Sequence, residues 1–363
     1  MSQLGLGMAQ DDAPAGPRPP RRERSGVRPA IVAIAALLAI GLAVFLGLRS
    51  LGGAANDFQG QGEGSVTVVV AKGDSLRQIG RTLADAGVVS DEGAFVDAAS
   101  SDDRAQGIAP GTYTLRSHMS GQAAVALMLD PASRQVKKLV IPEGWRQDRI
   151  LTAAAKATGL SVDQLKDSLA RAGTLGLPAY AESSTEGFLF PATYEFQPGV
   201  TPDLVVGAML KRFNQSAGQL DLEASAKALG RTPLEIVTVA SILEIEAGPD
   251  DYDKVARVLY NRLKAGMPLQ LDSTVNYALG LSTLKLTAAQ LKTDSPYNTY
   301  LHQGLPPGPI GSPGDAALQA ALNPAAGTWL YFVTTDPKTK KTEFATSYAD
   351  FLALKKKFQS NAG

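Results

Sequence analysis

The feature of this sequence that most restricts its fold is a helix with almost no polar face. Thr232, Pro233 and Glu235 predict where it begins, because a hydroxyl cap, a proline in the first turn and a glutamate at the third helical position together make a capping box. Aliphatic residues then cover nearly every side of the helix, which is typical of a helix buried in a core. Its last turn carries two acids, Glu244 and Glu246. A domain must therefore enclose most of this helix and accommodate its acidic end.

Glu244 and Glu246 are locally unfavourable at this position. Acids at a helix C-terminus oppose the helix dipole, and neighbouring aliphatic side chains raise the free-energy cost of their charges. A local violation in an otherwise consistent segment indicates function. The alternative is that both acids are solvated at a fraying helix end. Residues two apart on a helix point about 200° away from each other, so these two acids cannot flank a single bond of a substrate.

Composition limits the available chemistry to carboxylates and hydroxyls. The 363 residues are 44% hydrophobic, which is enough for two or three domains with sizeable cores. Lys plus Arg equals Asp plus Glu at 35 each, so no basic excess favours nucleic acid as a partner. There is no cysteine, and the only histidines are His118 and His302, which excludes thiol nucleophiles, disulfides and an ordinary zinc site. We therefore expect no metal and no cofactor.

The N-terminal segments predict a membrane anchor. Residues 1–29 contain five arginines and no periodic pattern, which is typical of a disordered basic tail. Residues 30–48 are 19 consecutive residues without a charge, which at ~1.5 Å per residue nearly matches a bilayer core of roughly 30 Å. The positive-inside rule keeps the tail in the cytoplasm, and a glycine-rich linker at 49–64 follows on the other side. A cleaved signal peptide is the alternative.

Residues 65–137 predict a small βααβ unit. A β-rich run at 66–70 is followed by a Gly-Asp turn, a helix from Leu76, a second helix near 92–99 and a returning strand at 111–115. With the motif GDSLRQIG, this pattern resembles a LysM-like module, and the resemblance implies glycan binding. An α+β domain that only positions its neighbour fits the same pattern.

Residues 138–363 predict a larger, mixed α+β domain around the apolar helix. A strand at 138–141 leads through a turn to a helix that begins near Gln147. The run 186–196 places aromatic residues around a proline. Such a run is usually part of a core, but Glu186 at its start does not fit a core position, so we treat it as a candidate polar contact.

Two segments after the apolar helix contribute further polar candidates. Residues 269–280 alternate like a short strand and then begin a helix, which puts Asp272 at the end of an element, where functional polar residues concentrate. Residues 293–318 form a long loop rich in proline and glycine that contains Tyr297 and Asn298. A loop of that length inside a compact domain is usually functional or disordered, and its aromatic residues and rigid prolines favour function.

Six motifs in order resemble the endolytic murein transglycosylase family, also called the YceG-like family. They are EGFLFPATY, ASILEIEAG, KVARVLYNRL, LQLDSTVNYALG, SPYNTY and GLPPGPIGSPG, and the resemblance runs from about residue 66 to the end of the chain. It implies a membrane-anchored enzyme that cleaves the β-1,4 bond between N-acetylmuramic acid and N-acetylglucosamine within peptidoglycan strands. The new strand ends are 1,6-anhydromuramyl, and the cleavage limits the length of nascent strands.

The resemblance also implies the catalytic residue and the partners. Glu244 is the first acid of the family's S-I-x-E pattern and is therefore implied as the catalytic acid, although Ile245 stands where the family often has lysine. The implied partners are peptidoglycan strands and the peptidoglycan synthases of the elongation machinery. The implied location is the bacterial inner membrane, with the N-terminus in the cytoplasm and the catalytic domain outside it.

The chemistry of the residues agrees with a mechanism that needs one acid. Glu244, kept protonated by apolar surroundings, can protonate the leaving oxygen, while the substrate's own acetamido group supports the positive charge at C1. Ser241 lies three residues earlier on the same helix face and is a candidate to orient the acid. The candidate substrate-binding residues are Ser241, Glu246, Asp272, Tyr297, Asn298 and Glu186.

Two alternatives stay open at the level of the sequence. One is a peptidoglycan hydrolase in which Glu244 and Asp272 form a pair of carboxyl groups at a separation of roughly 5–9.5 Å. The other is a non-catalytic scaffold that binds the cell wall through residues 65–137.

Overall fold

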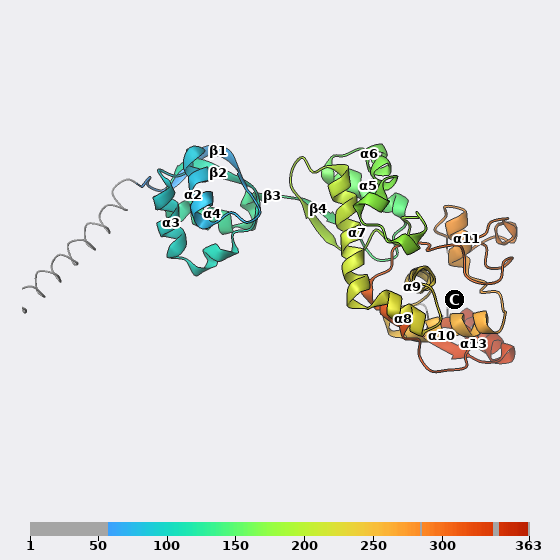
Figure 1. Ribbon diagram of the computed structural model, residues 1–363. Coiled ribbons are helices and arrows are strands. Elements are labelled where there is room, and N and C mark those ends of the chain that lie inside the picture. The colour runs from blue at the N-terminus through green and yellow to red at the C-terminus, as the bar shows by residue number, and fades with distance from the viewer. Residues whose placement is uncertain (1–56, 284, 337–340, 362–363) are drawn as a thin grey trace, which may run out of the picture. The chain divides into compact units, whose positions relative to one another are not determined.

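The computed structural model describes residues 57–283, 285–336 and 341–361 (Figure 1). Within these ranges the chain is mixed α+β, with many helices and three small sheets, in agreement with the predicted fold class. The predicted tail at 1–29, the predicted membrane span at 30–48 and the first part of the predicted linker lie outside the described residues. None of the helices in the described ranges has the length and apolar character needed to cross a bilayer.

The chain divides into two compact units. The described part of the smaller unit comprises residues 57–66, 75–107 and 116–127, and the larger unit comprises 67–74, 108–115 and the residues from 128 onward.

The first elements follow the predicted order of strand, helix, helix and strand. They are β1 (Gln61–Val70), α2 (Leu76–Asp85), α3 (Glu92–Ser100) and β2 (Gly111–Met119), and a further helix, α4 (Gly121–Leu129), follows them. Helix α2 begins at a complete capping box between Ser75 and Gln78 and packs against α3. Strand β1 begins inside the glycine-rich segment 49–64. The resemblance of this region to a LysM-like module stays a prediction.

The larger unit contains the remaining strands and helices. They are β3 (Arg134–Gln135), β4 (Lys137–Val140), α5 (Gln147–Thr158), α6 (Val162–Leu169), β5 (Thr193–Phe196), α7 (Pro202–Gln219), α8 (Leu222–Ala228), α9 (Pro233–Glu246), α10 (Tyr252–Lys264), α11 (Asp272–Ala278), α12 (Asp315–Leu322), β6 (Tyr331–Asp336), β7 (Lys341–Ala345) and α13 (Tyr348–Asn361). Strands β4 and β5 pair antiparallel, as do β6 and β7.

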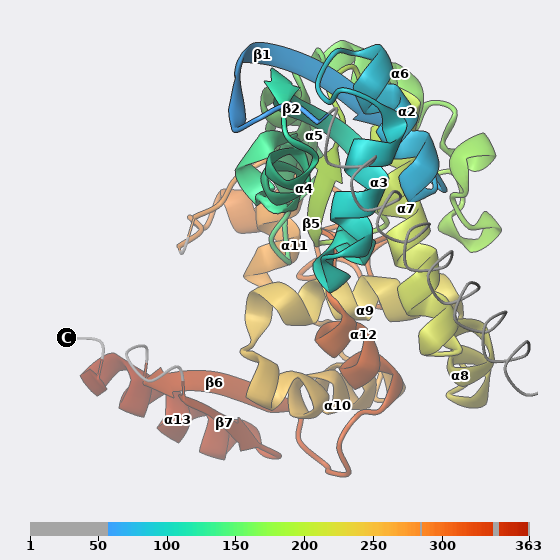
Figure 2. The same cartoon turned by 90° about the vertical axis from the view of Figure 1, so that its left-hand side faces the viewer.

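Helix α9 is the centre of the larger unit. All residues from Ile236 to Leu243 are buried, and α12, α10, α8 and α11 pack around the helix (Figure 2). The capping box between Thr232 and Glu235 is formed in both directions. The prediction of a buried helix that starts at this cap and ends at Glu246 is therefore confirmed.

The predicted short strand before Asp272 is wrong. The segment 269–271 is irregular, and Gln270 takes a φ of 55° in the left-handed region, which a strand does not allow. Its N–H donates to the Thr299 carbonyl, so the backbone bends toward the long loop. Leu269 and Leu271 are nevertheless both buried, which explains why the sequence alternates like a strand.

Candidate active site

Glu244 lies on the last turn of α9, half-buried, with both carboxylate oxygens hydrogen-bonded. The hydroxyl of Tyr252, the first residue of α10, donates to Oε2 at 2.8 Å. The backbone N–H of Gly314, which precedes α12, donates to Oε1 at 2.8 Å. Groups from two neighbouring helix starts therefore fix the orientation of this carboxyl.

Burial raises the pKa of the Glu244 carboxyl above its ordinary value. The hydrogen bonds from Gly314 and Tyr252 favour the charged form and act in the opposite direction, whereas the negative charge of Glu143 raises the pKa further. The net direction is upward. A carboxyl in this situation keeps its proton closer to neutral pH, which is the requirement for a general acid.

Ser241 holds the loop that carries Gly314. Its side chain is fully buried. Its Oγ donates to the Thr238 carbonyl at 2.7 Å and accepts the N–H of Ile310 at 3.0 Å. Ile310 belongs to the segment rich in proline and glycine that leads to Gly314, so the influence of Ser241 on Glu244 runs through this loop.

The turn between β4 and α5 pairs with the same loop. Gly144 donates its N–H to the Ser312 carbonyl at 2.8 Å, and Ser312 donates its N–H to the Trp145 carbonyl at 2.9 Å. Gly144 has a φ of +73°, a conformation that favours glycine, and a Cβ at this position would lie 3.6 Å from Glu244 Cβ. The turn therefore runs directly past the acid.

Glu143, Tyr252 and Gly314 are the neighbours of Glu244 that the sequence reasoning missed. Glu143 is exposed, yet a Cβ on Gly314 would fall 1.8 Å from its Oε1. The available sequence signals were a Pro-Glu-Gly turn and a glycine at the start of a helix, and both patterns are common turn chemistry. Only the fold brings these residues to α9.

Glu246 and Asp272 belong to a second acidic group. Burial raises the pKa of Glu246, and the negative charge of Asp272 raises it further. Asp272 itself is exposed and accepts the Tyr300 hydroxyl at 2.7 Å. Asp272 thus acts on Glu246, as expected if the two acids of α9 face different surroundings.

Glu186 is the centre of a third group. Its carboxylate accepts the N–H of Gln147 at 3.1 Å and the hydroxyl of Tyr277 at 3.3 Å. Burial raises its pKa to about 7 in spite of these hydrogen bonds. The ring of Tyr277 lies 4.7 Å from that of Tyr297, and the guanidinium of Arg146 lies 5.3 Å from the centre of the Tyr277 ring. The structure therefore brings two predicted site residues, Glu186 and Tyr297, into one cluster.

The side chain of Asn298 hydrogen-bonds to the backbone of the long loop to which it belongs. It is fully buried, and its amide donates to the carbonyls of Leu291 at 3.0 Å and Thr293 at 2.8 Å. Its Oδ1 accepts the N–H of Tyr300 at 3.0 Å. These bonds hold the shape of the long loop.

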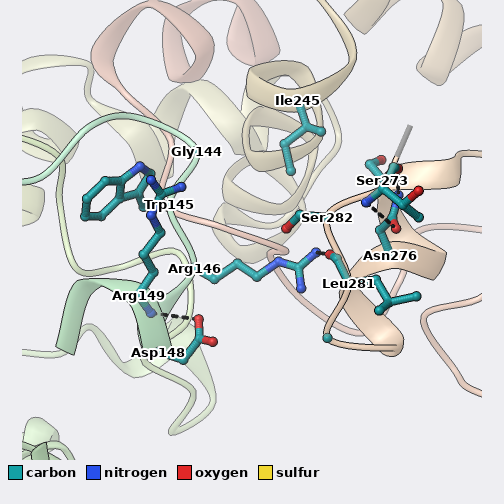
Figure 3. Close-up of a pocket in the computed structure, with 12 residues that line it drawn as sticks. Gly144, Trp145, Arg146, Asp148, Arg149, Ile245, Ser273, Asn276, Leu281 and Ser282 are labelled. Atoms are coloured by element: carbon teal, nitrogen blue, oxygen red, sulfur yellow. Dashed lines mark hydrogen bonds between the residues drawn. The ribbon is translucent and has the colours of Figure 1, made fainter. Parts of the chain in front are cut away.

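A cleft of about 370 Å³ opens beside the end of α9 (Figure 3). Its lining includes Gly144, Trp145 and Arg146 on one side, Ser273 and Leu281 on the other, and Ile245 from α9 between the two acids. Arg146 reaches across to the Leu281 carbonyl and donates to it at 2.7 Å. The lining residues thus adjoin all three acidic groups, although none of the acids themselves lines the cleft.

The described part of the chain contains no group of three or more His, Asp or Glu side chains arranged to hold a metal ion. Glu244, Glu186 and Asp272 accept hydrogen bonds from hydroxyls or backbone N–H groups.

Comparisons with known proteins find a family model, sequence relatives and a solved structure that resemble this chain. The sequence model of the YceG-like family matches residues 68–357. The endolytic murein transglycosylase of Bacillus subtilis (strain 168) is 32% identical over 285 residues, which cover 74% of this chain and 78% of the relative. The endolytic murein transglycosylase of Streptococcus pneumoniae serotype 2 is 29% identical over 316 residues, which cover 78% of this chain and 57% of the relative.

A crystal structure of a YceG-like protein from Listeria monocytogenes is similar to this chain with a TM-score of 0.55 and 30% sequence identity. The match covers 80% of this chain and 98% of the listerial one. The chain therefore belongs to the YceG-like family.

Proposed function

We propose that this protein is a lytic endotransglycosylase that cleaves the β-1,4 bond between N-acetylmuramic acid and N-acetylglucosamine within peptidoglycan strands and so limits their length. The relatives from Bacillus subtilis and Streptococcus pneumoniae carry the name endolytic murein transglycosylase. The observation that carries the proposal is the single carboxyl of Glu244, half-buried, with a raised pKa, held by two donors next to a cleft.

In the first step Glu244 acts as a general acid. Its proton passes to the glycosidic oxygen, the bond from that oxygen to C1 of the muramyl sugar breaks, and the N-acetylglucosamine product leaves with a 4-hydroxyl group. The acetamido oxygen of the muramyl sugar bonds to C1 and takes up the positive charge, as in substrate-assisted glycosidases. Tyr252 and Gly314 stabilise the carboxylate that Glu244 becomes, because each donates a hydrogen bond to it.

In the second step the Glu244 carboxylate acts as a base. It removes the proton of the muramyl C6 hydroxyl, and the C6 oxygen attacks C1 while the bond from C1 to the acetamido oxygen breaks. The product is the 1,6-anhydro sugar, and Glu244 is protonated again. No water is consumed.

The remaining predicted site residues fall into two roles. Glu246, Asp272, Tyr297 and Glu186 bind the hydroxyl and acetamido groups of the strand from the two clusters next to the cleft. Ser241 and Asn298 act indirectly, because their hydrogen bonds are with the loop backbones.

A hydrolase that pairs Glu244 with Asp272 is the less favoured function. The charge of Asp272 acts on Glu246, whereas the carboxylate whose charge acts on Glu244 is Glu143. A non-catalytic scaffold is also less favoured, because an acid that has a raised pKa and lies next to a cleft is a candidate general acid.

Membrane anchoring and the domain plan are part of the same proposal. Residues 30–48 span the inner membrane with residues 1–29 in the cytoplasm, and the glycine-rich segment from residue 49 leads from the span to β1, which begins at Gln61. Residues 65–137 bind glycan as a LysM-like module, and residues 138–363 form the catalytic domain. Peptidoglycan synthases of the elongation machinery supply the strands that are cut.

Mass spectrometry of the products from purified glycan strands tests the chemistry. Each cut by the wild type should yield a muramyl end lighter by one water than a hydrolytic end. Glu244→Gln keeps the size of the side chain and removes the transferable proton, so turnover should fall by about 100-fold to 10,000-fold while strands still bind.

Glu246→Gln is the matched control on the same helix turn, and its turnover should fall much less. Reducing muramyl ends from the wild type would show a hydrolase. Undiminished cleavage by Glu244→Gln would place the acid at another residue, and a wild type without any cleavage would favour the scaffold.

A further inference from the structure

The carboxyl groups of Glu143 and Glu244 both lie next to Gly314. Its Oε1 lies 1.8 Å from the position that a Cβ on Gly314 would take, and the N–H of the same glycine donates to Glu244 Oε1 at 2.8 Å. The Cβ position is joined to the Gly314 nitrogen by two bonds of about 1.5 Å each, Cβ–Cα and Cα–N. The Glu143 and Glu244 carboxylate oxygens are therefore no more than about 8 Å apart. That separation is short enough for both carboxyl groups to face one glycosidic bond.

The glycine at position 314 is what permits this approach. Any side chain there would occupy the space of the Glu143 carboxyl, because the Cδ and Cγ atoms of Glu143 also lie within 3.0 Å of the Cβ position. The turn that carries Glu143 is fixed to the loop before Gly314 by the paired backbone bonds of Gly144 and Ser312. The two carboxyl groups are thus held on either side of one residue.

Glu143 has no cationic partner among the described residues. It is exposed and takes part in none of the ion pairs formed by the described residues. Most charged groups on the elements packed against α9 have a partner. Asp315 forms an ion pair with Arg212, and Lys254 forms one with Asp251. Asp272 accepts the Tyr300 hydroxyl, and Arg257 and Arg146 donate to backbone carbonyls. Helix α8 adds Glu223 and Lys227, of which Glu223 acts on Tyr180.

The charge of Glu143 reaches the reaction centre. It raises the pKa of both Glu244 and its donor Tyr252, as a like charge at short range must. The same charge, aimed at the space beside Glu244, would attract a positive charge that develops on a sugar in that space.

We propose that Glu143 is a second carboxylate of this reaction centre, placed across Gly314 from Glu244. Its negative charge supports proton donation by Glu244 and stabilises the positive charge that develops at C1 as the glycosidic bond breaks. It forms no covalent bond and transfers no proton, so the anhydro product is unchanged by its presence. This role rests on the proposed transglycosylase function, and it makes Glu143 a positioning residue that acts through the field it creates.

The test is the pH profile of Glu143→Gln in the full-length protein. Gln keeps the size and removes the charge, so the pKa of Glu244 should fall. Because the general acid works only while protonated, the alkaline limb of the profile of kcat/KM should move to lower pH. At neutral pH kcat should drop by about tenfold to 100-fold with little change in KM. Glu143→Asp, which keeps the charge, should restore part of kcat and return the alkaline limb toward its wild-type position.

Glu223→Gln is the matched control, because Glu223 is exposed on α8 in the same unit. Its profile should coincide with that of the wild type. An unmoved alkaline limb in Glu143→Gln overturns the proposal, even if kcat is lower. A fall in kcat together with a fall in the midpoint temperature of thermal unfolding would mean that Glu143 has a structural role. Failure of the proposed function is a separate result: reducing muramyl ends from the wild type would reject transglycosylation, while a shifted limb in Glu143→Gln would still support the second carboxylate.

Discussion

The hydroxyl of Ser241 accepts the N–H of Ile310 at 3.0 Å, although the two residues are 69 positions apart. This bond joins the buried face of α9 to the loop that presents Gly314 to Glu244. Both partners are completely buried. The position of the acid's backbone donor is therefore set from inside the core.

Ser241→Ala should weaken both the fold and the activity. The change leaves the Ile310 N–H buried without its acceptor, which costs about 1–3 kcal/mol of the free energy of unfolding, and it frees the loop that carries Gly314. Urea unfolding and strand turnover measure the two effects. Thr238→Val is the control, because the Thr238 hydroxyl donates only to a carbonyl of its own helix, and its loss should cost less. Equal effects of the two changes would contradict a special role of the bond to Ile310.

Tyr252→Phe should move the alkaline limb of the activity profile to higher pH. The Tyr252 hydroxyl stabilises the charged form of Glu244 and lowers its pKa. Removal of that donor raises the pKa, so the acid keeps its proton to higher pH. Tyr260 lies on α10 like Tyr252, but its hydroxyl donates to the Ala321 carbonyl of α12. Tyr260→Phe should therefore leave the limb in place. A shift to lower pH would mean that Glu244 is not the acid that the profile reports.

The centre of the fold was predictable from the sequence because its signals are local. The capping box at Thr232 and the apolar surface up to Leu243 are features of one continuous segment. Glu244 breaks the apolar pattern of that segment, which marks it as a candidate functional residue. The run at 269–271 predicts a strand but is irregular in the structure, because buried leucines on either side of Gln270 produce the same alternation as a strand.

The surroundings of Glu244 could not be predicted in the same way. Gly314 is 70 positions away from it, and nothing in the Pro-Glu-Gly turn indicates that Glu143 reaches Gly314. Asn298 is the reverse case, a residue whose contacts differ from those that its sequence position suggests. Its position in a polar loop predicted contact with a ligand, whereas its amide is used by the carbonyls of Leu291 and Thr293. Sequence indicates which polar residues are unusual, but the fold decides what they contact.

The predicted topology places everything after residue 49 outside the cytoplasm. Five arginines precede the segment 30–48, and the positive-inside rule keeps them in the cytoplasm. Protease added to spheroplasts should therefore digest the region after residue 49 and leave the N-terminal tail protected. A cytoplasmic protein in the same cells serves as the control for intact membranes. Recovery of an intact soluble domain from the cytoplasm would contradict this topology.

Glu186 should make the protein less stable as the pH rises through the range from 4.5 to 7. Its pKa is raised by burial from an ordinary value of 4.5 to about 7, so in this range the folded protein holds a proton that the unfolded chain has released. The free energy of unfolding then falls with rising pH, by on the order of 1–3 kcal/mol for this group. Glu186→Gln removes the titration and still offers an oxygen to the Gln147 N–H.

Urea unfolding at pH 5 and pH 8 measures the effect of Glu186 on stability. The wild type should lose more stability between the two values than Glu186→Gln. The difference between the two losses isolates Glu186 from Glu244 and Glu246, the other acids with a raised pKa. Glu223→Gln, an exposed substitution in the same unit, should lose as much as the wild type. An equal loss in Glu186→Gln and the wild type would mean that Glu186 is charged in the folded protein across this range, and its cluster with Tyr277 would then have to bind substrate as a full negative charge.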